Sequence, residues 1–263
     1  MEPTKSDVLN RDSWYRELEI DCLDGKVEHF YIEMTGTGTV IPEMQAEPGE
    51  WTKLEFHTCP GCPLTGLTRY CPAALALEST LLRFRDHFSY SPVKATSVDR
   101  AGRRTSVEGS LQEVGSVFVQ LAVFSSGCPV GKHFRPMLRD LRPFATNDEL
   151  GRHLISKGLL KHRGSVSKAK KEIIDGLEPL HVVFSHQMKR LADTAKGDAV
   201  PNSLVRMDAF TMNISLQIDD VFDSMKQELG WDSDEASDEF EKPVLKPGPW
   251  QRIVKAFNSL LGR

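Results

Sequence analysis

The chain has 263 residues, of which 40% are hydrophobic and 27% are charged, and its formal net charge is -4. This apolar content supports a folded core and excludes a globally disordered chain. The charges are mixed, with 33 basic and 37 acidic side chains, and give no electrostatic footprint for nucleic acid, so we expect no nucleic-acid partner.

The beginning of the chain is polar. Residues 1–13 lack the apolar segment of a secretory signal, and we expect them to form a mobile leader. No apolar run in the sequence reaches the length that a transmembrane helix needs. We therefore expect a cytoplasmic protein without a transmembrane segment.

The first predicted elements are strands. Apolar and polar residues alternate over 14–23 and again over 27–34, and the turn signal Asp24-Gly25 between them predicts a β-hairpin. The segment 51–56 is predicted to form a third strand, which leads to His57 and the first cysteines. A small antiparallel sheet is thus expected before the cysteine-rich part.

The rest of the folded region is expected to be mostly helical. A second hairpin is expected over 90–107, and Pro136 and Pro143 predict a broken stretch over 134–146. Apolar residues at helical spacing predict helices over 73–88, 111–124, 147–163, 166–195 and 201–229. The predicted fold class is therefore α+β, with a small N-terminal antiparallel sheet followed by a mostly helical body.

We expect one metal-binding α+β domain over 14–229, with a sheet part (14–58) and a cysteine-rich and helical part (59–229). Six acidic residues fall within ten positions after Trp231, and three prolines follow, which predicts an acidic, Pro-containing linker over 230–249.

Residues 250–263 are expected to form a separate amphipathic helix. Its apolar residues recur at spacings of three and four and form one stripe: Trp250, Ile253, Val254, Phe257, Leu260 and Leu261. A helix this short is marginal in water and must dock on something. We expect a protein partner; packing back onto the domain is the ordinary alternative, and peripheral membrane contact is less favoured because the helix carries few cations.

The five cysteines carry the functional signal. An odd number in a chain without an export signal argues against a disulfide framework. Cys22 lies in an alternating stretch and is expected to be a small buried hydrophobe. Each of the other four precedes a proline, a coincidence with a chance probability on the order of 10⁻⁵: Cys59, Cys62, Cys71 and Cys128.

These four thiols are expected to ligate one metal centre. Thiolates are soft ligands that suit zinc and iron–sulfur clusters. Structural zinc sites more often use two Cys-x-x-Cys pairs, whereas this chain has one pair and two single cysteines, so a 4Fe–4S cluster in electron transfer or redox sensing is favoured.

Two alternatives stay open. A four-cysteine zinc site could hold the fold of a non-enzymatic adaptor. Cys59-Pro-Gly-Cys62 also resembles a thiol–disulfide redox pair. No nucleophile, base or cofactor loop is recognisable, which leaves enzymatic activity undecided and favours a protein that is not an enzyme.

Two further residues are candidates for contact with the metal centre. His57 is two positions before Cys59 and could ligate metal or hydrogen-bond a thiolate. Arg135 follows Cys128 closely and could compensate the negative charge of a four-thiolate cluster.

Several motifs together resemble an uncharacterised bacterial family, a domain of unknown function, and the likeness extends from about Tyr15 to Asp220. The motifs that carry it are Phe56-His57-Thr58-Cys59-Pro60-Gly61-Cys62-Pro63-Leu64, Cys71-Pro72, Ser126-Gly127-Cys128-Pro129-Val130, Arg135-Pro136-Met137 and Pro143-Phe144-Ala145-Thr146. The resemblance implies a bacterial source and suggests that the four Cys-Pro units belong together. It implies no activity.

Overall fold

A computed structural model of the chain describes residues 14–34, 39–40, 48–84, 86–99, 101–138, 141–194 and 197–230. The chain divides into two compact units, residues 1–225 and 226–263. The predicted leader (1–13) and docking helix (250–263), with all six of its stripe residues, lie outside the described residues, as does the predicted linker except for Gly230.

The predicted α+β fold is confirmed. In the part of the chain that the structure describes, five strands form one antiparallel sheet in the order β3-β2-β1-β4-β5: β1 (Trp14–Asp21), β2 (Val27–Met34), β3 (Thr39–Val40), β4 (Pro92–Asp99) and β5 (Arg104–Ser110). Both predicted hairpins are present as β1–β2 and β4–β5. In the first, Gly25 has a φ of 92°, a conformation that glycine adopts without steric cost.

One face of the sheet is buried. Leu18 pairs with Phe30 across β1 and β2, and Ile20 pairs with Ala95 across β1 and β4; all four side chains are buried. The Phe30 ring stacks on Phe84 at a centroid distance of 5.8 Å, which fixes the end of the first helix against this face. The hydrophobic core therefore continues from the sheet into the helices.

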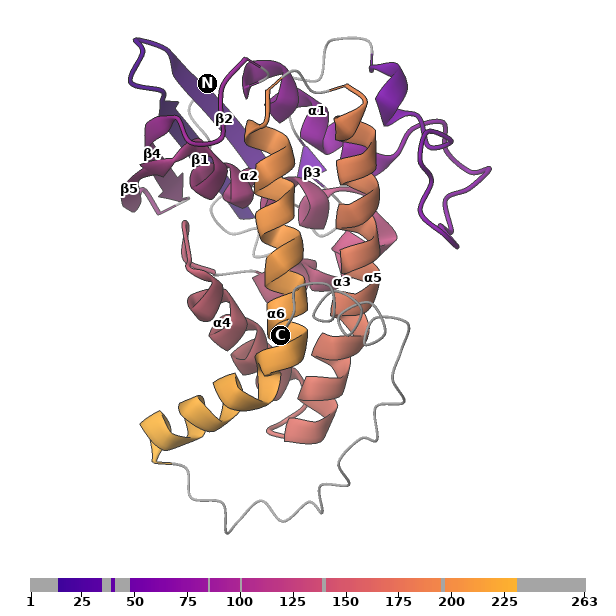
Figure 1. Ribbon diagram of the computed structural model, residues 1–263. Helices are drawn as coiled ribbons and strands as arrows, with labels where there is room; N and C mark the ends of the chain where they lie inside the picture. The colour runs from indigo at the N-terminus through magenta and orange to yellow at the C-terminus, as the bar shows by residue number, and fades with distance from the viewer. Residues whose placement is uncertain are drawn as a thin grey trace, which may run out of the picture. The chain divides into compact units, whose positions relative to one another are not determined.

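Within the described residues, six helices follow or interrupt the sheet strands: α1 (Pro72–Phe84), α2 (Leu111–Ser125), α3 (Pro129–Leu138), α4 (Asn147–Lys161), α5 (Val166–Ala192) and α6 (Ala199–Leu229). Five of them confirm predicted helices. Helix α4 begins with a reciprocal capping box, which Thr146 and Glu149 form. In Figure 1 the two long helices α5 and α6 run side by side. Nδ1 of His181 on α5 lies 2.5 Å from Oδ1 of Asp208 on α6.

Helix α3 was not predicted. It begins at Pro129, where the missing N–H of proline costs nothing, and Pro136 falls in its last turn. A proline near the end of a ten-residue helix removes little of the hydrogen-bonding pattern, so the expected broken stretch is helical up to Leu138.

The predicted third strand over 51–56 is wrong. Glu50–Thr52 form a short 3-10 helix (η2), turns follow, and one isolated bridge joins Lys53 to Tyr70. Trp51, Thr52 and Leu54 are buried, so burial along this looped segment does not alternate as it does in a strand with one buried face. The carbonyl groups of this loop accept hydrogen bonds from Arg190 of α5 and not from a neighbouring strand.

Gly131 allows α3 to lie directly against α2. A β-carbon at this position would be 2.1 Å from the carbonyl oxygen of Val123. We expect Gly131→Ala to lower the free energy of unfolding by about 2 to 3 kcal/mol, because one backbone must move away from the other. Urea unfolding measures this effect, with the exposed neighbour Lys132→Ala as control; equal stability of the two variants would contradict the close approach.

Within the described residues, no single helix has the length and apolar character needed to cross a membrane; α2 and α3 meet that criterion only when the bent pair is taken together.

Candidate metal centre

Cys59 and Cys62 lie in a tight turn that their sequence dictates. The N–H of Cys62 donates to the carbonyl of Cys59 at 3.1 Å, and Gly61 has a φ of 67°. Proline at the second position and glycine with positive φ at the third are the signature of a type II turn. The turn leaves both cysteine side chains partly buried against the hydrophobic core.

Cys71 and Cys128 each precede the first residue of a helix, α1 and α3 respectively, and both are buried. Proline is favoured at the first helical position, which explains locally why Pro72 and Pro129 follow these cysteines. The N–H of Cys71 also donates to the carbonyl of Thr52 at 2.7 Å, which ties α1 to the loop before Cys59.

The Cys128 sulfur receives backbone hydrogen bonds at the start of α3. Burial raises the pKa of this thiol, and N–H groups of Gly131 and Val130 that donate to the sulfur oppose the shift. These donors favour a charged sulfur, and so does the positive end of the helix dipole. Burial and these donors act on Cys128 in opposite directions, and burial has the larger effect.

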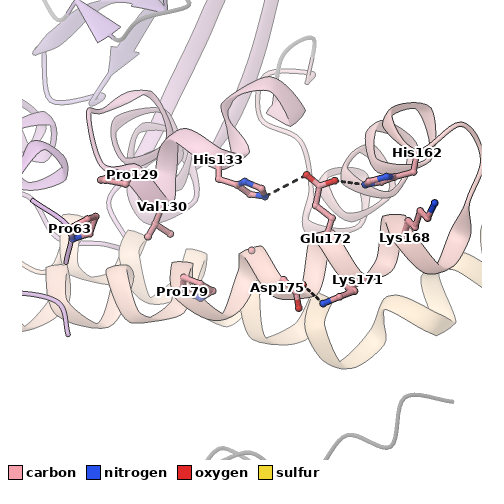
Figure 2. A pocket seen from close by; sticks show the side chains of 11 residues that line it. Pro63, Pro129, Val130, His133, His162, Lys168, Lys171, Glu172, Asp175 and Pro179 are labelled. Atoms are coloured by element: carbon pink, nitrogen blue, oxygen red, sulfur yellow. Dashed lines mark hydrogen bonds and ion pairs between the residues drawn. The ribbon is translucent and has the colours of Figure 1, made fainter. Parts of the chain in front are cut away.

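The four cysteines come together in space. Burial, followed by the proximity of Cys71, Cys128 and Cys62, raises the pKa of Cys59 to about 12. The flanking residues also meet: a β-carbon on Gly127 would lie 3.4 Å from Pro72. Pro63 and Pro129, which follow Cys62 and Cys128, line one cleft (Figure 2). We call Cys59, Cys62, Cys71 and Cys128 the cysteine cluster.

No three sulfur atoms of the cysteine cluster lie within 4.8 Å of one another. Four thiolates on one zinc ion would hold their sulfur atoms about 3.8 Å apart, whereas a 4Fe–4S core separates them by about 6 Å. Among the described residues, one group of three metal-ligating atoms lies within 4.8 Å of one another, and it is Cys22, Asp24 and His87. Burial, followed by Asp24, raises the pKa of Cys22 to about 11, so this thiol stays protonated, and Cys22 is buried as predicted.

Arg190 of α5 is a buried positive charge beside the cysteine cluster. Its side chain is 1% exposed, and its guanidinium donates to four backbone carbonyls of the loop before Cys59: Trp51 at 2.6 Å, Lys53 at 2.7 Å, Leu54 at 3.1 Å and His57 at 3.4 Å. In the described part of the chain no carboxylate forms an ion pair with it.

The charge of Arg190 is balanced by cysteines. Burial lowers the pKa of Arg190, and thiolates at Cys71, Cys59 and Cys62 act in the opposite direction. A buried charge is costly unless it is paired. The groups placed to pair with this guanidinium are therefore the sulfur atoms of the cluster.

Gln187, one helical turn before Arg190, is the second buried polar group. It is 1% exposed, and its amide nitrogen donates to the Cys71 sulfur at 3.5 Å. Its amide oxygen has no hydrogen-bond partner within the described residues. Buried hydrogen bonds of this kind to a sulfur atom orient metal-bound thiolates and help to set the reduction potential of the metal centre.

The two predicted contact residues lie nearby with other partners. Nε2 of His57 is 3.0 Å from the Asp193 carboxylate, and the His57 backbone has a φ of 51°. Arg135 donates to the carbonyls of Phe124 at 3.3 Å and Ser126 at 2.8 Å, so it holds the segment before Cys128. Direct contact of either side chain with a metal centre stays a prediction.

The sequence analysis missed Gln187 and Arg190. Both occupy positions of the apolar stripe of α5, which also contains Leu180, Phe184 and Leu191. A polar residue on the buried face of a helix must have a partner in the core. Polar residues within the apolar stripe could have indicated a buried polar site in the sequence, but they do not indicate which group is the partner.

The fold and the cysteine cluster define the class of this protein: an α+β domain in which one loop and the starts of two helices bring four cysteines to the face of a long helix. The chain belongs to the family described as "Domain of unknown function (DUF6901)", whose model matches residues 19–229. This confirms the predicted resemblance to a domain family of unknown function. Comparison with curated proteins and with solved structures gives no match.

Proposed function

We propose that the cysteine cluster binds a 4Fe–4S cluster and that the protein transfers single electrons or senses redox state. The observation that carries the proposal is the buried guanidinium of Arg190, which has cysteine sulfurs and no carboxylate as its counter-charge among the described residues. A cluster held by four thiolates has a net negative charge and supplies the missing partner.

Two observations favour a cluster over the alternatives. No three of the four sulfur atoms lie within 4.8 Å of one another, which suits a 4Fe–4S core better than a single zinc ion. Cys71 and Cys128 lie close to Cys59 and Cys62, and a thiol–disulfide function of the Cys59–Cys62 pair does not account for them. A four-cysteine zinc site in an adaptor protein is the second candidate, supported by the same buried donor groups.

Absorption spectra of anaerobically purified full-length protein test the redox function. Charge transfer between sulfur and iron gives a 4Fe–4S protein a broad absorption at about 400 nm, part of which is lost on reduction by dithionite. We expect this change to reverse on oxidation. A colourless protein with one bound zinc would support the adaptor, and an iron chromophore that cannot be reduced would contradict electron transfer.

The hydrogen bond from Gln187 predicts a change in redox potential. Gln187→Leu removes the donor to Cys71 and the unpartnered amide oxygen together, so folding should tolerate it. A hydrogen bond worth about 1 kcal/mol more in the reduced state corresponds to roughly 40 mV in a one-electron step. We expect the potential to become more negative by about that amount.

Spectroelectrochemical titration measures the Gln187→Leu potential, and Met188→Leu, an apolar exchange at the next position, is the control. An unchanged potential in Gln187→Leu would show that the amide does not interact with a metal-bound sulfur.

A protein partner for residues 250–263 and a cytoplasmic location stay predictions.

A further inference from the structure

An open cleft of about 700 Å³ lies along α5 beside the cysteine cluster. This volume is within the range of small-molecule sites, about 300 to 1,000 Å³. Pro63 and Pro129 line the cleft, and each directly follows a cysteine of the cluster. The cleft therefore shares a wall with the cysteine cluster but is built from other side chains.

The lining of the cleft is divided between an apolar and a charged end. In Figure 2, Pro63, Pro129, Val130 and Pro179 gather at one end, and His162, Lys168 and Lys171 lie at the other. Lys168 and Pro179 are eleven positions apart on the same helix, which corresponds to about 16 Å. An elongated ligand with an apolar body and a polar group at one end matches this division.

The charged end has an excess of positive charge. Glu172 is approached by His133 at 3.6 Å, by His162 at 2.5 Å and by Lys161, as Figure 2 shows for the two histidines. Burial opposes its ionisation, but hydrogen bonds from Lys161 and His162 hold the pKa of Glu172 below its usual range. Glu172 is therefore ionised, and its negative charge is already paired with several donors.

The remaining lysines leave one charge without a partner. Lys171 is paired with Asp175 at 2.5 Å, whereas Lys168 has no carboxylate partner in the described part of the chain. The charged end thus has three lysines, Lys161, Lys168 and Lys171, but two carboxylates, Glu172 and Asp175. Its net charge is therefore positive even when both histidines are neutral.

We propose that this cleft binds a small amphipathic organic anion. Its apolar body lies over Pro63, Pro129, Val130 and Pro179, and its anionic group lies at Lys168. Apolar lining supplies binding energy, and a few polar groups fix the orientation of the ligand. The inference goes beyond the proposed function, because none of the cleft residues is a cysteine and the site exists whatever metal the cysteine cluster holds.

Binding of 1-anilinonaphthalene-8-sulfonate to the full-length protein tests the proposal. This probe joins an apolar aromatic body to an anionic group, and its fluorescence rises on transfer to an apolar site. We expect decanoate to displace it from the cleft. We expect 1-decanol, which has the same chain without the charge, to displace it about tenfold less effectively, because it lacks the attraction to Lys168.

Two variants locate the bound probe. Lys168→Glu should weaken its affinity about tenfold by reversing the unpartnered charge. This exposed position lies in the first turn of α5, where an acidic side chain favours the helix, so folding is preserved. Val130→Trp should lower the amount bound by filling the apolar end. Lys189→Glu, the same change about 30 Å further along α5, is the control and should leave the affinity unchanged.

Equal affinity in the wild type, Lys168→Glu and Val130→Trp would overturn the proposal, since the probe would then bind elsewhere. Equal displacement by decanoate and 1-decanol would overturn the anion preference. Metal analysis of the same preparations keeps the two proposals separate: a protein without iron that still shows these differences refutes the 4Fe–4S cluster and leaves the anion site standing.

Discussion

Replacing any one of Cys59, Cys62, Cys71 or Cys128 by alanine is expected to reduce bound iron at least tenfold, because each substitution removes a direct ligand. Each cysteine supplies one of four thiolates, and a site with three cysteines leaves one iron atom without a ligand from the protein. Because metal binding is coupled to folding, the same variants should also unfold at lower urea concentration than the metal-loaded wild type.

Cys22→Ala is the matched control for this series. Cys22 is also buried, at 6% exposure, but it stands apart from the cysteine cluster, so its replacement should leave the iron content unchanged. Iron loss in Cys59→Ala and Cys62→Ala alone would contradict a four-ligand centre, because Cys71 and Cys128 would then not be ligands.

Arg190→Met is expected to lower the free energy of unfolding by about 3 to 5 kcal/mol. The guanidinium is the donor for four backbone carbonyls between Trp51 and His57, and methionine leaves these acceptors without it. The loop that they belong to positions Cys59, so we also expect less bound iron in the fraction that folds.

The neighbouring substitution Lys189→Met provides the comparison, because Lys189 is exposed and its replacement should change stability by no more than about 0.5 kcal/mol. Urea unfolding of both variants gives the two free energies. A loss below about 1 kcal/mol in Arg190→Met would mean that water replaces the guanidinium at these carbonyls, and the buried charge would lose its importance.

Local sequence patterns predicted most of the secondary structure. The Asp24-Gly25 turn, the alternation on both sides of it and the helical spacing of five segments each depend on residues that are close in sequence. The same holds for the Cys59–Cys62 turn, where proline and glycine set the backbone. Such patterns need no knowledge of distant contacts.

The errors arise where distant residues decide the local structure. The segment 51–56 was predicted to be a strand, but its carbonyl groups bind Arg190, more than 130 positions later. The proline that follows Cys71 and the one that follows Cys128 are helix starts, so part of the Cys-Pro coincidence has a local cause. The convergence of the four cysteines depends on helix packing that spacing alone cannot give.

Iron and acid-labile sulfide analysis of anaerobically purified full-length protein tests the central claim most directly. A 4Fe–4S cluster on the cysteine cluster predicts about four iron and four sulfide per chain, with little zinc. One zinc per chain without iron or sulfide would contradict the cluster and leave the four cysteines as a structural site.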